Sequence, residues 1–116
     1  MKSVLAAIAL LVSAGSWATS PALKCDQGPA NRTFGKSPWL VYGCNDGRSV
    51  VVVTAPGSPA MPFYFMFSFS AGAYHLVGEG TGSKVVTDAA YRELSKLTNP
   101  QIRLLYLEAV ASAKSK

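Results

Sequence analysis

The side chains best suited to catalysis lie on two predicted strands in the second half of the chain. His75 is the single histidine, and Glu79 follows at a spacing that places both side chains on one face of a strand. Ser68 lies opposite His75 if residues 63–70 and 73–79 pair as a hairpin. A serine, a histidine and an acid act together only when hydrogen bonds join them in a water-shielded pocket. On an open sheet face these side chains are not shielded from water. We therefore interpret His75 as an ordinary strand histidine and assign no catalytic residue.

The glycine-rich stretch 78–84 (GEGTGSK) follows a predicted strand and precedes a predicted helix, where backbone N–H groups can hold an anion. Its serine and lysine stand in the wrong order for a nucleotide-binding loop, and Glu79 adds negative charge. We therefore expect a flexible connection and no cofactor. We expect no metal site either, because one histidine and scattered carboxylates provide no set of ligands.

Residues 1–18 have the layout of a bacterial secretory signal peptide. Lys2 precedes the apolar run 4–12 (VLAAIALLV), and residues 16–18 (SWA) fit the small-x-small cleavage pattern. Cleavage after Ala18 is the preferred reading, with Ala22 as the alternative. The run is too short to span a membrane. The sequence therefore predicts a periplasmic or secreted protein with no membrane span after cleavage.

Charge and cysteine content narrow the class of protein further. The chain of 116 residues carries a formal net charge of +5, but its basic residues are scattered, which argues against a nucleic-acid partner. Cys25 and Cys44 are the two cysteines of an exported chain and are expected to form a disulfide. Closing a loop of this length contributes roughly 3 kcal/mol.

A first hairpin is predicted from residues 39–44 (WLVYGC) and 48–55 (RSVVVVTA), which are rich in β-branched and aromatic side chains. Asp46 and Gly47 between them suit a tight two-residue turn. That turn places Tyr42 opposite Val51 and Leu40 opposite Val53, whereas a three-residue loop with a bulge would shift this register.

A second hairpin is predicted from residues 63–70 (FYFMFSFS) and 73–79 (AYHLVGE), because aromatic residues alternate with period two in the first of these segments. Phe69 then pairs with Tyr74 and Phe67 with Leu76. One apolar face carries Phe63, Phe65, Phe67, Phe69, Tyr74 and Leu76. Two helices follow, the first from Ser83 or Thr87 to Leu97 and the second capped by Thr98 or Asn99 and continuing to Ala113.

These elements predict a small α+β domain over residues 39–116. Its sheet is a four-stranded antiparallel meander of two hairpins, and both C-terminal helices pack on one face. Residues 19–38 lack any periodicity and are expected to form an irregular segment tethered by the disulfide.

Two helices cover only one face of such a sheet, so an apolar surface is expected on the other face. Its predicted members in the second hairpin are Tyr64, Met66, Val77 and, beside them, His75. An uncovered apolar patch of this kind marks a partner surface. The alternative is that residues 19–38 fold back over it through Leu23 and Phe34.

The sequence thus predicts an exported small envelope protein that serves as a non-catalytic binding or interaction module. Its partner is expected to be a second copy, forming a homodimer, or another envelope protein. Two other hypotheses stay open: a secreted inhibitor of another enzyme, which would use the proline-rich loop 56–62, and a small enzyme centred on His75.

Overall fold

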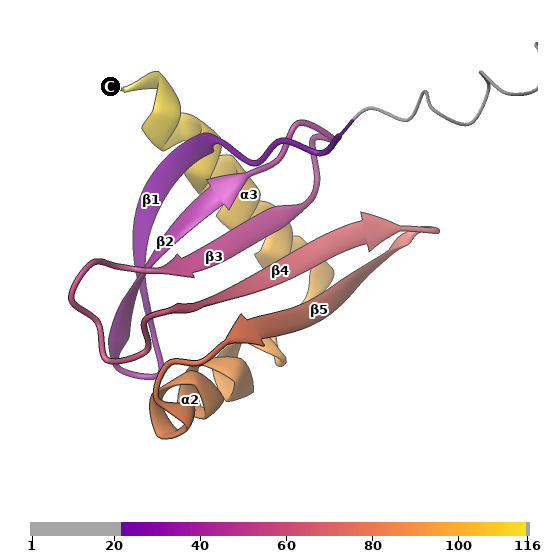
Figure 1. The fold of residues 1–116 in the computed structure, drawn as a ribbon. Coiled ribbons are helices and arrows are strands. Elements are labelled where there is room, and N and C mark those ends of the chain that lie inside the picture. The colour runs from indigo at the N-terminus through magenta and orange to yellow at the C-terminus, as the bar shows by residue number, and fades with distance from the viewer. Residues whose placement is uncertain (1–21, 116) are drawn as a thin grey trace, which may run out of the picture.

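The computed structural model describes residues 22–115, so the predicted signal peptide 1–18 lies outside the described residues. Figure 1 shows one layer of strands backed by the helices α2 and α3. The elements are β1 (Gln27–Phe34), β2 (Ser37–Gly43), β3 (Val50–Thr54), β4 (Phe63–Ser70), β5 (Ala73–Gly80), α2 (Lys84–Leu94) and α3 (Asn99–Lys114).

The strands form one antiparallel sheet in the order β1-β2-β3-β4-β5. The general α+β class and the meander are as predicted, but the sheet has five strands and not four. The irregular segment predicted over residues 19–38 was wrong for residues 27–34, which form the additional edge strand β1, whereas residues 19–21 lie outside the described residues.

β1 is hidden in the sequence because its helix-side face holds an arginine between two apolar residues. Ala30 and Phe34 are buried in the core, whereas Arg32 between them donates a hydrogen bond from Nη1 to Glu108 Oε1 of α3 at 2.6 Å. The turn into β2 is equally unusual, since Gly35 and Lys36 both have positive φ angles of 59° and 66°. A Cβ on Gly35 would lie 2.5 Å from the backbone nitrogen of Ala90, so this turn also requires glycine for its contact with α2.

The registers predicted for the two hairpins are confirmed. Leu40 pairs with Val53 and Tyr42 with Val51. In the second hairpin Phe67 pairs with Leu76, and Phe69 pairs with Tyr74. A two-residue turn through Ala71 and Gly72, with φ angles of 51° and 79°, produces the second register. The two-residue turn predicted at Asp46 and Gly47 was wrong. The N–H of Cys44 donates to the carbonyl of Ser49, so residues 45–48 form a four-residue loop that gives the same register.

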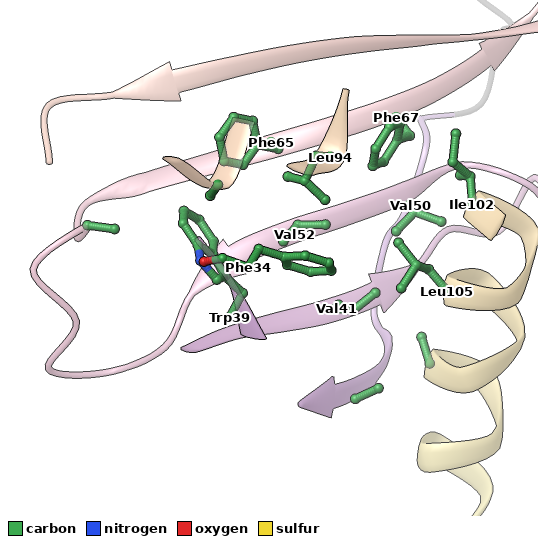
Figure 2. Close-up of a cluster of buried hydrophobic side chains, with 14 residues drawn as sticks. Phe34, Trp39, Val41, Val50, Val52, Phe65, Phe67, Leu94, Ile102 and Leu105 are labelled. Carbon is green, nitrogen blue, oxygen red and sulfur yellow. The ribbon is translucent and has the colours of Figure 1, made fainter. Parts of the chain in front are cut away.

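The core lies between the helices and one face of the sheet (Figure 2). Phe65 and Phe67 are each 2% exposed, and Leu94 of α2 and Leu105 of α3 pack in the same cluster. Trp39 is completely buried at its centre, with its ring centroid 5.3 Å from that of Phe65. Both helices therefore cover the phenylalanine face, as predicted.

The helix boundaries follow from local capping. α3 begins with a capping box, in which the Thr98 side chain accepts from the Gln101 N–H and the Gln101 side chain accepts from the Thr98 N–H. α2 ends at Leu94, earlier than the predicted Leu97. The N–H of Leu97 instead donates to the carbonyl of Leu94 in a tighter closing turn. Across residues 22–115, no helix combines the length and apolar character needed to cross a membrane.

Candidate functional site

The face of the sheet opposite the helices is not covered by any helix or strand of residues 22–115. We call it the open face. The side chains on the open face can be identified from the strand registers, because residues paired across neighbouring strands point to the same side of the sheet. The members are Asn31, Thr33, Pro38, Leu40, Tyr42, Val51, Val53, Tyr64, Met66, Ser68, Ser70, Ala73, His75, Val77 and Glu79.

The centre of the open face is apolar. Met66 lies between Val51 of β3 and Val77 of β5 and is half-buried by these neighbours. Val77 is 52% exposed and Tyr64 is 38% exposed. The four predicted surface residues Tyr64, Met66, Val77 and His75 therefore lie together, and Leu40, Tyr42, Val51 and Val53 extend the apolar area across β2 and β3.

A shallow hollow of about 440 Å³ lies at one end of the open face. Its walls are mostly apolar and include Val53, Pro62 and Phe63. Tyr64 donates a hydrogen bond to Glu79 Oε1 at 3.2 Å on its rim, and this bond to a carboxylate raises the pKa of the phenol. The hollow can accept an apolar side chain from a partner.

Residues 22–38 do not cover the open face. Phe34, one of the two predicted covering residues, is 4% exposed because it packs into the core on the helix side. Leu23, the other, is 43% exposed. The segment instead continues the sheet sideways as β1 and adds Asn31 and Thr33 to the rim of the open face. Sequence reasoning missed these two residues because it missed the strand.

The geometry around His75 does not assemble a nucleophilic site. Ser68 and His75 are paired across the hairpin as predicted, but Ser68 Oγ donates to the backbone carbonyl of His75 at 3.5 Å and not to its imidazole. Glu79 lies four residues further along β5, roughly 13 Å away at the usual strand rise, and accepts from Tyr64. His75 itself is exposed to solvent.

The glycine-rich stretch 78–84 is held in place, in contrast to the flexible connection predicted. Its first residues, Gly78 to Gly80, belong to β5. The N–H groups of Thr81 and Gly82 both donate to the carbonyl of Pro62 and that of Ser83 donates to Pro59. Three backbone donors of the stretch are therefore already used by the proline-rich loop.

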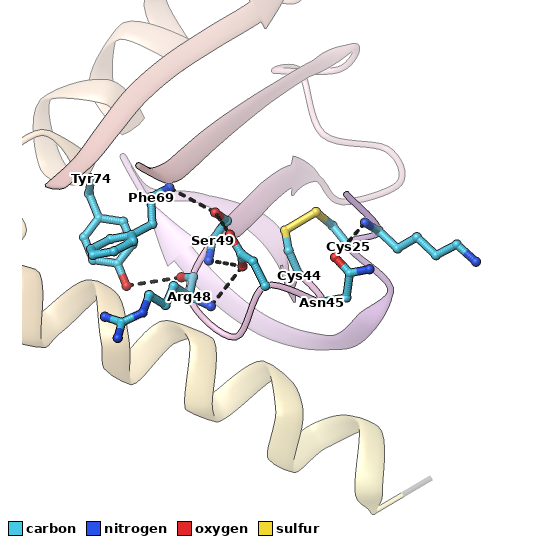
Figure 3. Close-up of a disulfide and its surroundings, with 9 residues drawn as sticks. Cys25, Cys44, Asn45, Arg48, Ser49, Phe69 and Tyr74 are labelled. Atoms are coloured by element: carbon cyan, nitrogen blue, oxygen red, sulfur yellow. Dashed lines mark hydrogen bonds between the residues drawn. A yellow bond between two sulfur atoms is a disulfide. The ribbon is translucent and has the colours of Figure 1, made fainter. Parts of the chain in front are cut away.

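The predicted disulfide between Cys25 and Cys44 is present, and it joins the chain before β1 to the end of β2 (Figure 3). Hydrogen bonds reinforce the same point: Asn45 N–H donates to the Lys24 carbonyl at 2.7 Å, and Lys24 N–H donates to Asn45 Oδ1 at 3.1 Å. The disulfide therefore closes the open end of the β1–β2 hairpin, at the border of the open face.

The β2–β3 turn is held by Asp46. Its Oδ1 accepts from the N–H groups of Arg48 and Ser49, and its Oδ2 accepts from Ser49 Oγ at 2.6 Å. Ser49 Oγ in turn accepts from the N–H of Phe69 in β4 (Figure 3). Burial alone would raise the pKa of the Asp46 carboxyl, but the hydrogen bonds from Ser49 and Arg48 outweigh it and lower the pKa.

The lowered pKa of Asp46 gives folding a pH dependence that Asp46→Asn should reduce. A carboxyl whose pKa is lower in the folded state stabilises the fold above its unfolded pKa of about 4. That contribution is lost as the pH falls through the lower folded value. We expect the urea midpoint of the wild type to fall more steeply below about pH 4 than that of the variant. Parallel midpoint curves for the two proteins between pH 7 and pH 2.5 would contradict this role.

Residues 22–115 contain no group of three or more histidine, cysteine, aspartate or glutamate side chains placed to hold a metal ion. No protein-family model, curated protein or solved structure matches the chain. The fold and the open face are therefore the observations on which a function can be argued.

Proposed function

We propose that this protein is an exported, non-catalytic interaction module of the bacterial envelope, and that its open face binds the flat apolar surface of a partner protein. The observation that carries the proposal is the row of apolar side chains across β2, β3, β4 and β5, which no described element covers. A contiguous exposed apolar patch on a small domain is typical of an interaction surface. The disulfide is consistent with an exported protein.

Charge favours a protein as the partner. No lysine or arginine is among the open-face positions of the described strands, although the whole chain carries a net charge of +5. Arg32, the one cationic residue within the described strands, faces the helices and pairs with Glu108. Nucleic acids and anionic lipid surfaces are bound through cations, whereas a protein surface of matching shape is bound through apolar contact.

A lysine at the centre of the open face tests the proposal. Met66→Lys places a charge between Val51 and Val77, where a bound partner would exclude water. We expect the amount of partner that co-purifies from the native cells at a fixed bait concentration to fall at least about 10-fold.

Leu104→Lys is the matched control, because Leu104 is 56% exposed on α3, away from the open face. The amount of partner that co-purifies with this variant should equal that of the wild type. Equal loss with both variants, or no loss with Met66→Lys in a protein whose circular dichroism is unaltered, would overturn the proposal. Co-purification of a second copy of this chain alone through the open face would replace the partner protein by a homodimer.

A further inference from the structure

The free edge of β5 is the second unpartnered surface of the sheet. β5 is the last strand in the order β1-β2-β3-β4-β5, so within the described residues it has β4 as its neighbour on one side and none on the other. A free edge presents unpaired N–H and C=O groups to any extended strand. In soluble proteins such edges are usually protected by proline, lysine or a bulge.

The two edges of this sheet differ in that protection. β1 contains Pro29 and has a register irregularity between Gln27 and Ala30. β5 (AYHLVGEG) contains no proline and no lysine, and its register with β4 is regular over its full length. The C-terminal half of β5 is also accessible, since Val77, Gly78 and Glu79 are all exposed. β5 is therefore the edge with fewer features that would prevent pairing with another strand.

The register shows which groups of β5 are free. The two-residue turn at Ala71 and Gly72 makes Ser70 and Ala73 a hydrogen-bonded pair, and such pairs alternate along an antiparallel ladder. Residues 73, 75, 77 and 79 therefore direct their backbone groups toward β4. Leu76 and Gly78 direct theirs to the free edge, and no other backbone hydrogen bond uses them.

We propose that a second copy of this chain pairs with β5, antiparallel and centred on Val77, to form a two-fold symmetric dimer with one continuous sheet. In this register Leu76 of each copy exchanges backbone hydrogen bonds with Gly78 of the other. The same register places His75 opposite Glu79 of the second copy, twice by symmetry, and Val77 against its own counterpart.

Neighbouring registers lack this complementarity. Pairing centred on Leu76 would set His75 against Val77, and pairing centred on His75 would set the two histidines against each other. The apolar strip of Val77 and Met66 would become continuous across the two copies, so the dimer would double the open face. This inference concerns the edge and stands independently of what binds the open face.

The experiment is sedimentation equilibrium of the mature, disulfide-intact protein up to about 100 µM, in the range where an interface of modest size assembles. We expect dimers. His75→Glu opposes two carboxylates in each pair and should raise the dimer dissociation constant about 10-fold. Adding Glu79→Lys to that variant sets opposite charges against each other and should return the constant to within about threefold of the wild type.

Val77→Lys and Val85→Lys form the second arm. Val77→Lys sets two lysines together at the symmetry axis and should leave monomers, whereas Val85, 80% exposed on α2, should tolerate the same change. A monomeric wild type, a dimer that survives Val77→Lys, or a charge reversal that fails to rescue His75→Glu would each overturn the proposal. Met66→Lys, which tests the open face, should remain dimeric.

Discussion

Trp39→Ala is expected to remove most of the stability of the protein. Trp39 is completely buried, and its indole ring contacts Phe65 at the centre of the core. Truncating a buried tryptophan costs about 3–5 kcal/mol through lost burial and the cavity that remains. The total free energy of unfolding of a domain of this size is roughly 5–10 kcal/mol. The variant should therefore unfold at a much lower urea concentration, as followed by far-ultraviolet circular dichroism.

Trp39→Phe separates packing from hydrogen bonding in that result. The indole Nε1–H lies 2.9 Å from Ser37 Oγ and 3.1 Å from the carbonyl of Phe34, and phenylalanine keeps a ring but loses this donor. We expect a loss of about 1–2 kcal/mol from this change, well below that of the alanine variant. Equal losses for the two variants would show that the hydrogen bonds dominate at Trp39.

Removal of the disulfide is the second change with a large expected effect. Replacing both Cys25 and Cys44 by serine releases a loop with a sequence separation of 19 residues. The unfolded state gains chain entropy, which lowers the free energy of unfolding by about 3 kcal/mol. For a domain of this size the melting temperature should fall by about 15 °C.

Calorimetry of the double serine variant checks this expectation, and the wild type held under reducing conditions provides the control. A fall of less than about 3 °C would contradict it. In that case the hydrogen bonds between Lys24 and Asn45 would suffice to hold the end of the β1–β2 hairpin.

The second hairpin and the side of the sheet that the helices cover could be predicted because local signals agree there. The phenylalanines of β4 alternate strictly, and a turn at Ala71 and Gly72 gives one register for the strands around it. The first hairpin is apolar on both faces, so its sequence alone did not show which face is buried. The pairing of Val50 with Phe67 and Val52 with Phe65 decides it, because this register aligns β3 with the phenylalanine face.

β1 could not be predicted for two physical reasons. Arg32 interrupts the apolar alternation of its buried face, and the partner that permits this, Glu108, lies 76 residues away in α3. The turn after it uses Lys36 at a positive φ, which lysine rarely adopts and which no turn pattern anticipates. The part of the candidate site on β4 and β5 could therefore be predicted from the sequence, whereas the part on β1 could not.

The most direct test of the open face uses a photo-reactive phenylalanine analogue placed at Tyr64 or at Tyr91 in the native cells. Both tyrosines are exposed to a similar degree, 38% and 47%, but Tyr64 lies on the open face and Tyr91 on α2. We predict that illumination links the Tyr64 position to one partner protein and leaves the Tyr91 position without that adduct. The same adduct from both positions, or from Tyr91 alone, would contradict the open face as the binding surface.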